Sequence, residues 1–94
     1  MEIQQKDYNS LYYKQFIKKK MQEFIENLAE QFDETDIALL LPETVFKDLD
    51  EWSSLLALSV IAMADESYDV KLKGDDISNA ITIEDLYNII NSRK

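Results

Sequence analysis

Turn-forming residues are scarce in this chain, and this scarcity limits its fold more than any other feature. The 94 residues include a single glycine, Gly74, and a single proline, Pro42. An average protein has about 7% glycine and 5% proline. Sandwiches and barrels of β-strands need many tight turns, so the sequence favours helices joined by few connections. A chain of this length forms one domain with one small core, and its 46% of hydrophobic residues is typical of a folded protein.

The clearest helical pattern lies in residues 17–32. Six apolar residues recur there at helical spacing and form one stripe: Ile17, Met21, Phe24, Ile25, Leu28 and Phe32. Upstream, residues 11–16 either extend this helix back to a cap at Asn9 or Ser10 or fold back onto the bundle. Both alternatives stay open. We therefore treat residues 1–13 as an N-terminal extension and residues 14–94 as the domain.

A long loop is predicted after this helix. The helical period is lost over residues 33–52, and Pro42 ends any helical turn that begins at Ile37. Five apolar residues are expected to hold the loop against the core: Leu40, Leu41, Val45, Phe46 and Leu49. A loop of this length in a small domain is often functional.

The second helix is predicted to begin at the Ser53-Ser54 pair, with Ser53 as its N-cap. An inward stripe is expected at four positions: Leu55, Leu58, Ile61 and Ala62. The remaining positions are also largely apolar until Asp65 and Glu66, and they include Leu56, Ala57, Val60 and Met63. A helix that is apolar on nearly all sides is either buried or binds a partner.

The last part of the chain contains a linker and two more helices. An alternating apolar pattern predicts an extended linker: Tyr68, Val70 and Leu72. A short helix is expected over residues 76–80, capped by Asp75 or Asp76, and a final helix begins at Thr82, three residues before Asp85, as in a capping box. Its core-facing residues are expected to be Ile83, Leu86, Tyr87 and Ile90. The predicted fold class is therefore all-α, a small bundle of three main helices and one short helix with a long loop between the first two helices.

Several classes of function are excluded by missing residue types. The chain has no cysteine and no histidine, which removes disulfides, thiolate metal sites, cysteine nucleophiles and the commonest general base and metal ligand. A hydrolase would need a serine–lysine pair or paired carboxylates, and the proximity of Lys47 and Asp48 to Ser54 in the sequence is too general to indicate one. We expect no enzyme activity, no catalytic residue and no metal site. The longest nearly apolar run, residues 55–64, is too short for a membrane span, and residues 1–10 lack the apolar stretch of a secretory signal, so a cytoplasmic protein is expected.

Charge is distributed unevenly along the chain. Residues 1–20 carry a net charge of +3, residues 21–70 carry −12, and residues 71–94 are balanced, which gives −9 in total. Such an acidic surface disfavours binding to nucleic acid and steers the protein towards partners with basic patches, although the acidity also keeps a small protein in solution. The lysines at 18–20 form either an anion site or a solvated helix face.

Four sequence features follow one another in order between Val45 and Ile90. They are a loop phenylalanine (Phe46), a serine–leucine pair at a helix start (Ser54-Leu55), acids and an aromatic residue at the end of that helix, and a last helix that starts at a threonine and contains Asp85-Leu86. In this order and at these spacings they resemble the acyl carrier protein family, as a discrete stand-alone member.

The resemblance implies a carrier that catalyses nothing itself. In the family, the serine before the leucine, here Ser54, receives a 4'-phosphopantetheine arm from coenzyme A, attached by a phosphopantetheinyl transferase. The thiol of the arm then holds acyl or aminoacyl groups as thioesters, and the carrier, usually a monomer, passes them between loading and processing enzymes. A serine at a helix start suits this task because it is exposed, and its phosphodiester would lie at the positive end of the helix dipole. Capping alone would also explain the two serines.

This sequence departs from the family pattern at the modified serine and along the second helix. The family usually has an aspartate where Ser53 stands, and serine supplies the cap but not the charge. An unmodified carrier-like interaction module therefore remains the alternative. Acids are also absent early in the second helix, which implies apolar docking and a dedicated biosynthetic pathway for a polyketide, a nonribosomal peptide or a modified lipid.

Two sets of contact residues follow from the resemblance. The residues expected to meet partner enzymes are Trp52, Ser53, Leu55, Leu56, Val60, Asp65, Glu66 and Ile77. The residues expected to line an acyl chain are Ile61, Leu72 and Ile77, which serve equally well as core residues. The tyrosines of the extension either cover an apolar patch or bind a partner, and the sequence does not choose between these roles.

Overall fold

The computed structural model describes the backbone of residues 2–94 and the side chains of residues 14–94. Its elements, in chain order, are α1 (Glu2–Ala29), the 3₁₀-helices η1 (Ile37–Leu39) and η2 (Phe46–Asp48), α2 (Ser54–Tyr68), α3 (Gly74–Asn79) and α4 (Ile83–Ser92). The described backbone forms no strand, only an isolated bridge between Val45 and Thr82. The prediction of an all-α bundle, with three main helices, one short helix and a long first loop, is confirmed.

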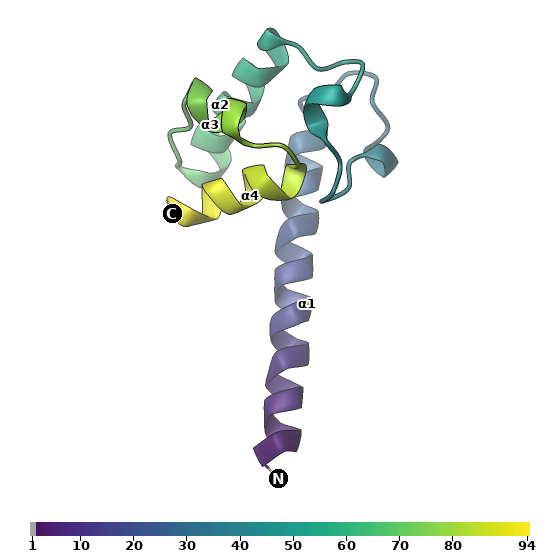
Figure 1. Ribbon diagram of the computed structural model, residues 1–94, viewed down its shortest axis with the longest axis vertical. Coiled ribbons are helices and arrows are strands. Elements are labelled where there is room, and N and C mark those ends of the chain that lie inside the picture. Colours follow the sequence, from purple (N-terminus) through teal and green to yellow (C-terminus); the bar gives the residue numbers. More distant parts are fainter. Residues whose placement is uncertain (1) are drawn as a thin grey trace.

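Helix α1 is longer than the sequence pattern predicted. It begins at Glu2, so neither Asn9 nor Ser10 caps it, and residues 2–13 continue the helix instead of folding back onto the bundle. Its 28 residues span about 42 Å at 1.5 Å per residue. The other elements gather around the C-terminal part of α1, and its N-terminal part stands away from them (Figure 1). The buried stripe begins at Met21, and Ile17, which was expected to belong to it, is exposed.

The core lies where the C-terminal part of α1 meets the remaining elements. Helix α1 packs against α2, α4 and η1, and α3 packs against α4. The largest fully buried side chains come from α1, the long loop, α2, the linker after α2 and α4: Phe24, Leu28, Leu40, Phe46, Val60, Val70, Ile83, Leu86 and Ile90. The ring of Phe24 lies 6.0 Å from that of Tyr68 and 5.6 Å from that of Tyr87, so one aromatic residue of α1 contacts both α2 and α4.

The long loop is held by fewer side chains than expected. Leu40 and Phe46 are buried, and Leu49 packs half-buried against the core, as predicted. Leu41 and Val45 were expected to be buried too, but they are 48% and 38% exposed, so this part of the prediction is wrong.

Backbone hydrogen bonds hold the stretch around Leu41 and Val45 instead. The Ile83 N–H donates to the Thr44 carbonyl at 3.1 Å, and the Glu84 N–H donates to the Pro42 carbonyl at 2.9 Å. The start of α4 thus satisfies loop carbonyls directly, and the apolar side chains of the loop need not reach the core.

The buried face of α2 is the reverse of the predicted one. Its buried residues are Leu56, Val60, Met63 and Ala64. Of the predicted stripe, Leu55 and Leu58 are 75% and 62% exposed, Ala62 is exposed and Ile61 is half-buried. Both sets recur at helical spacing, and the helix is apolar on both faces, so the hydrophobic pattern alone cannot choose between them. The packing of α2 against α1 makes the choice.

The last two helices follow the predicted order, with one shift in register. Helix α3 begins at Gly74 rather than at residue 76, and its N-cap is Lys73, so the prediction that Asp75 or Asp76 caps it is wrong. Both acids lie in the first turn of α3. The Asp76 carboxylate accepts a hydrogen bond from the Lys73 N–H at 2.8 Å and pairs with Arg93 at the end of α4, with 2.6 Å between Oδ2 and Nη1. This pair joins the start of α3 to the C-terminal end of α4 and lowers the pKa of Asp76.

Helix α4 has the capping box that the sequence predicted. The Thr82 hydroxyl accepts from the Asp85 N–H at 3.1 Å, and the Asp85 carboxylate accepts from the Thr82 N–H at 2.9 Å. All four residues expected to face the core are buried: Ile83, Leu86, Tyr87 and Ile90. The predicted linker is shorter than expected, because Tyr68 is the last residue of α2 and Asp69 is its left-handed C-cap. Beyond the cap, Val70 and Leu72 are buried and Lys71 between them is exposed, as the alternating pattern predicted.

Candidate functional site

The two serines at the start of α2 have different environments. Ser53 has extended backbone angles, with φ −156°, and its hydroxyl accepts a hydrogen bond from the Leu56 N–H at 3.1 Å. Ser53 is therefore the N-cap, as predicted. Ser54 is the first residue of the helix and is exposed to solvent. The cap does not use the hydroxyl of Ser54, so this side chain can change without loss of the cap.

The helix start gives Ser54 a favourable setting for an anion. The first N–H groups of any helix lack intrahelical partners, and they carry the partial positive charge of the helix dipole. In α2 the Leu56 N–H is bonded to Ser53, and the Ala57 N–H donates to the Ser53 carbonyl. The N–H groups of Ser54 and Leu55 are the other donors of the first turn, and they lie at the positive end of the α2 dipole.

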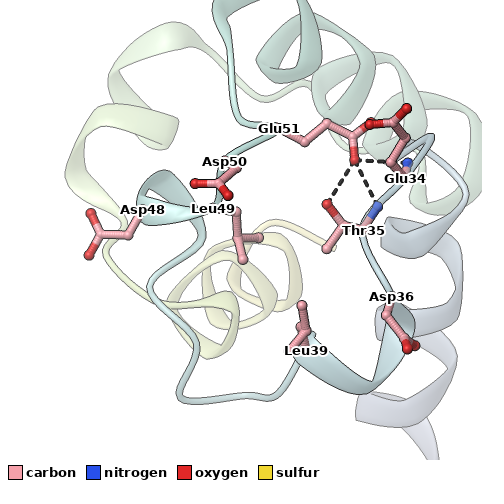
Figure 2. Close-up of a pocket in the computed structure, with 8 residues that line it drawn as sticks. All are labelled: Glu34, Thr35, Asp36, Leu39, Asp48, Leu49, Asp50 and Glu51. Atoms are coloured by element: carbon pink, nitrogen blue, oxygen red, sulfur yellow. Dashed lines mark hydrogen bonds between the residues drawn. The ribbon is translucent and has the colours of Figure 1, made fainter.

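The segment before Ser54 is held in place by Glu51. Its carboxylate accepts hydrogen bonds from the backbone N–H groups of Asp33, Glu34 (3.1 Å) and Thr35 (2.9 Å) and from the Thr35 hydroxyl (2.7 Å). Figure 2 shows Glu51 reaching across to Thr35. These donors, the Asp33 N–H first, lower the pKa of Glu51 to about 2. Glu51 thus ties the chain just before α2 to the chain just after α1.

A ring contact supports the same segment from a second direction. The ring of Trp52 meets that of Phe46 edge-on, with 4.9 Å between centroids, and Phe46 is buried. Lys47, the residue after Phe46, donates a hydrogen bond from its Nζ to the Ser78 carbonyl at 2.8 Å and so links the loop to α3. Glu51 and Phe46 together fix the approach to Ser54.

A cavity of about 560 Å³ lies beside this segment (Figure 2). Its lining residues are Glu34, Thr35, Asp36, Leu39, Asp48, Leu49, Asp50 and Glu51. Five of these eight are acids, so the surface near the start of α2 is strongly negative and suits a partner with a basic patch. Among the described residues, no group of three or more acids is arranged to hold a metal ion.

The predicted partner contacts divide into exposed and buried residues. Ser53, Leu55 and Glu66 are exposed, and Trp52 and Asp65 are half-buried. Leu56, Val60 and Ile77 were expected to meet a partner, but they are 7%, 0% and 6% exposed, so the structure leaves them little surface for such a contact. Ile77 is buried on α3. Leu56 and Val60 are buried because the face of α2 that packs against the core is opposite to the one that the pattern suggested. Leu58 takes their place on the outer surface; the sequence pattern had assigned it to the core.

The residues expected to line an acyl chain lie in the core. Leu72 and Ile77 are both buried in the main hydrophobic cluster, and Ile61 packs half-buried against it. All three side chains therefore contribute to the main hydrophobic core of the domain.

Two contributors to the site were not identified from the sequence. Glu51 was one acid among many in the loop, and nothing in its spacing marked it as the residue that accepts four hydrogen bonds. Leu58 was placed on the wrong face of an evenly apolar helix. Both depend on contacts between segments that are distant in the sequence or on the rotation of α2.

Within residues 2–94, no helix combines the length and the apolar character that crossing a membrane requires.

Comparison with other proteins adds no family assignment. Comparisons of the chain with protein-family models, with curated proteins and with solved structures find no significant match.

Proposed function

We propose that this protein is a carrier that holds acyl or aminoacyl groups as thioesters on a 4'-phosphopantetheine arm attached to Ser54. The observation that carries the proposal is the division of labour between the two serines: Ser53 caps α2, and the exposed Ser54 is free of that role. The resemblance of residues 45–90 to acyl carrier proteins supplies the chemistry, since it places the modified serine directly before a leucine at a helix start.

The residues around Ser54 fit such an arm. The exposed hydroxyl is accessible to a modifying enzyme, and the positive end of α2 favours the phosphodiester that would result. Glu51 and Phe46 hold the preceding segment, so the attachment point keeps a fixed position relative to the bundle. The arm would supply the thiol that carries the cargo, and the chain itself supplies the attachment point and the surface that partners recognise.

The outer face of α2 supports docking through apolar contacts. Leu55 and Leu58 project from this face with most of their surface in solvent, and Trp52 lies half-buried just before them. Glu66 adds an exposed acid at the far end of α2, and the acidic loop flanks its start. A partner with an apolar patch beside basic residues would match this surface, as expected of enzymes in a dedicated polyketide, nonribosomal-peptide or modified-lipid pathway.

An unmodified interaction module is the second candidate. It is favoured by Ser53, which provides the cap of α2 without the carboxylate that the family usually has beside the modified serine. In this case the outer face of α2 would bind partners, and Ser54 would remain a hydroxyl.

Intact-protein mass spectrometry distinguishes the two candidates. The protein is incubated with coenzyme A, Mg²⁺ and a broad-specificity phosphopantetheinyl transferase, and a carrier of known competence serves as a positive control. We expect a mass gain of one phosphopantetheinyl group, its loss in Ser54→Ala and its retention in Ser53→Ala.

A Ser53→Asp variant is included so that a failure to modify the natural chain can be interpreted. It keeps a capping oxygen and adds the missing charge, so we expect modification at least as fast as in the natural sequence. If neither the natural chain nor Ser53→Asp is modified while the control carrier is, the carrier proposal fails and the interaction module remains. Modification that survives Ser54→Ala but not Ser53→Ala would place the site one residue earlier.

A further inference from the structure

A second cavity lies between the middle of α1 and the loop segment that contains η1. Its volume is about 370 Å³, and its lining includes Met21 and Ile25 from α1 and Ile37, Leu40 and Leu41 from the loop. Small-molecule pockets span roughly 300–1,000 Å³ and are mostly apolar with a few polar groups that set orientation. This cavity, here called the α1–η1 groove, meets that description at the lower end of the size range.

The groove has a closed apolar floor and open apolar walls. Met21, Ile25 and Leu40 are buried and form the floor, while Ile37 and Leu41 leave 44% and 48% of their surface in solvent. Apolar surface that stays in water on a folded protein is stabilised when an apolar molecule covers it. The groove therefore favours an apolar chain along its floor.

The charge of the groove is opposite to that of the acidic cavity beside Glu51. Lys18 is the one charged residue in its lining, and exposed Lys14 stands one helical turn earlier on the same face of α1. The cavity beside Glu51, in contrast, is lined by five acids. In a chain with a net charge of −9, an anion is repelled from the acidic cavity and attracted to the groove.

We propose that the α1–η1 groove binds a free medium-chain carboxylic acid without a covalent bond, with the alkyl chain on the apolar floor and the carboxylate at Lys18. The small volume favours a medium chain over a long lipid, and the single lysine favours an ionised acid over a neutral or cationic head. This site is separate from Ser54 and does not depend on the arm.

Nuclear magnetic resonance titration of the full-length chain tests the proposal with three ligands of equal length. Octanoate should give saturable shifts in the backbone signals of residues 18–25 and 37–42, 1-octanol should bind more weakly at the same signals, and octylammonium should bind most weakly. Ser54→Ala should bind octanoate as the natural chain does, which keeps this test independent of the carrier proposal.

Matched variants separate the head group from the tail. Lys18→Gln should weaken octanoate binding roughly two- to fivefold, as expected for a partly exposed ion pair, and leave 1-octanol unchanged. Lys19→Gln, its neighbour outside the lining, should change neither. Leu41→Ser should weaken both ligands about fivefold through lost apolar contact. Leu39→Ser, at a position that is also about half exposed but lines the acidic cavity, should change the binding of neither ligand.

Several outcomes would overturn the proposal. These are the absence of saturable shifts, shifts centred on Leu72 and Ile77 in the core, equal binding of octylammonium, and equal effects of Lys18→Gln and Lys19→Gln. The last experiment measures binding of the protein to vesicles of neutral lipid, with and without anionic lipid. Binding to anionic vesicles without saturable binding of free octanoate would assign the lysines to a lipid surface and refute the groove as a site for a free acid.

Discussion

Leu55 and Leu56 are neighbours in the sequence, but their replacement by alanine should affect stability very differently. Leu56 is 7% exposed and packs into the core, whereas Leu55 is 75% exposed. The pair is matched in residue type and in helix, and the two residues lie in the same first turn, two and three residues after the N-cap. The comparison therefore isolates burial and tests directly which face of α2 turns inward.

The size of each effect follows from the buried surface. Truncation of a buried leucine to alanine costs about 2–5 kcal/mol, and we expect about 3 kcal/mol at Leu56, which lies in the first turn of α2. Full burial of a leucine side chain is worth about 1.5–3 kcal/mol, so the quarter of Leu55 that is buried contributes on the order of 0.5 kcal/mol. Alanine has a slightly higher helix propensity than leucine, but this gain applies to both positions and cancels in the comparison.

Thermal denaturation followed by far-ultraviolet circular dichroism and by Trp52 fluorescence measures both variants. In a domain of this size 1 kcal/mol corresponds to about 4–8 °C, so Leu56→Ala should lower the melting temperature by roughly 10–25 °C and Leu55→Ala by only a few degrees. If Leu56→Ala does not fold, Leu56→Val and Leu55→Val give the same comparison with a smaller loss of stability. Equal losses would refute the packing described above, and a larger loss at Leu55 would show that the stripe of Leu55, Leu58, Ile61 and Ala62 is the buried one.

Two further predictions concern the segment that leads into α2. The pKa of Glu51 falls from its ordinary 4.5 to about 2, so its carboxylate favours the folded state above about pH 4.5, and this contribution is lost as the pH falls towards 2. Urea denaturation at pH 7, 4 and 2.5 should therefore show a smaller loss of stability on acidification for Glu51→Gln than for the natural chain. An unchanged pH dependence would contradict the role of Glu51, and Glu66→Gln on the outer surface is the control. Ser53→Ala should lose about 1 kcal/mol with the N-cap, whereas Ser54→Ala should change the unfolding free energy little. If Ser54→Ala lowered the unfolding free energy more than Ser53→Ala in the same assay, Ser53 would not be the N-cap of α2.

The local structure of the chain could be predicted from its sequence because short-range chemistry determines it. Ser53 caps α2 and Thr82 pairs with Asp85 at the start of α4, since a hydroxyl or carboxylate three residues from an unpaired N–H can reach it in any context. The core face of α4 was equally predictable, because only one side of that helix is apolar. The position of Ser54 at a helix start belongs to the same class of local information.

The sequence could not determine features that depend on contacts between distant segments. Helix α2 is apolar on both faces, so its rotation, and with it the exposure of Leu55 and Leu58, depended on packing against α1. Leu41 and Val45 were free to stay exposed because the backbone of α4 satisfied the loop carbonyls beside them. The four hydrogen bonds that the Glu51 carboxylate accepts come from residues 33–35, which lie next to it only because of the way the loop folds. Hydrogen bonds within a few residues are specified by the sequence alone, whereas the choice between two equally apolar faces, and the partner of a single acid, were decided by the tertiary structure.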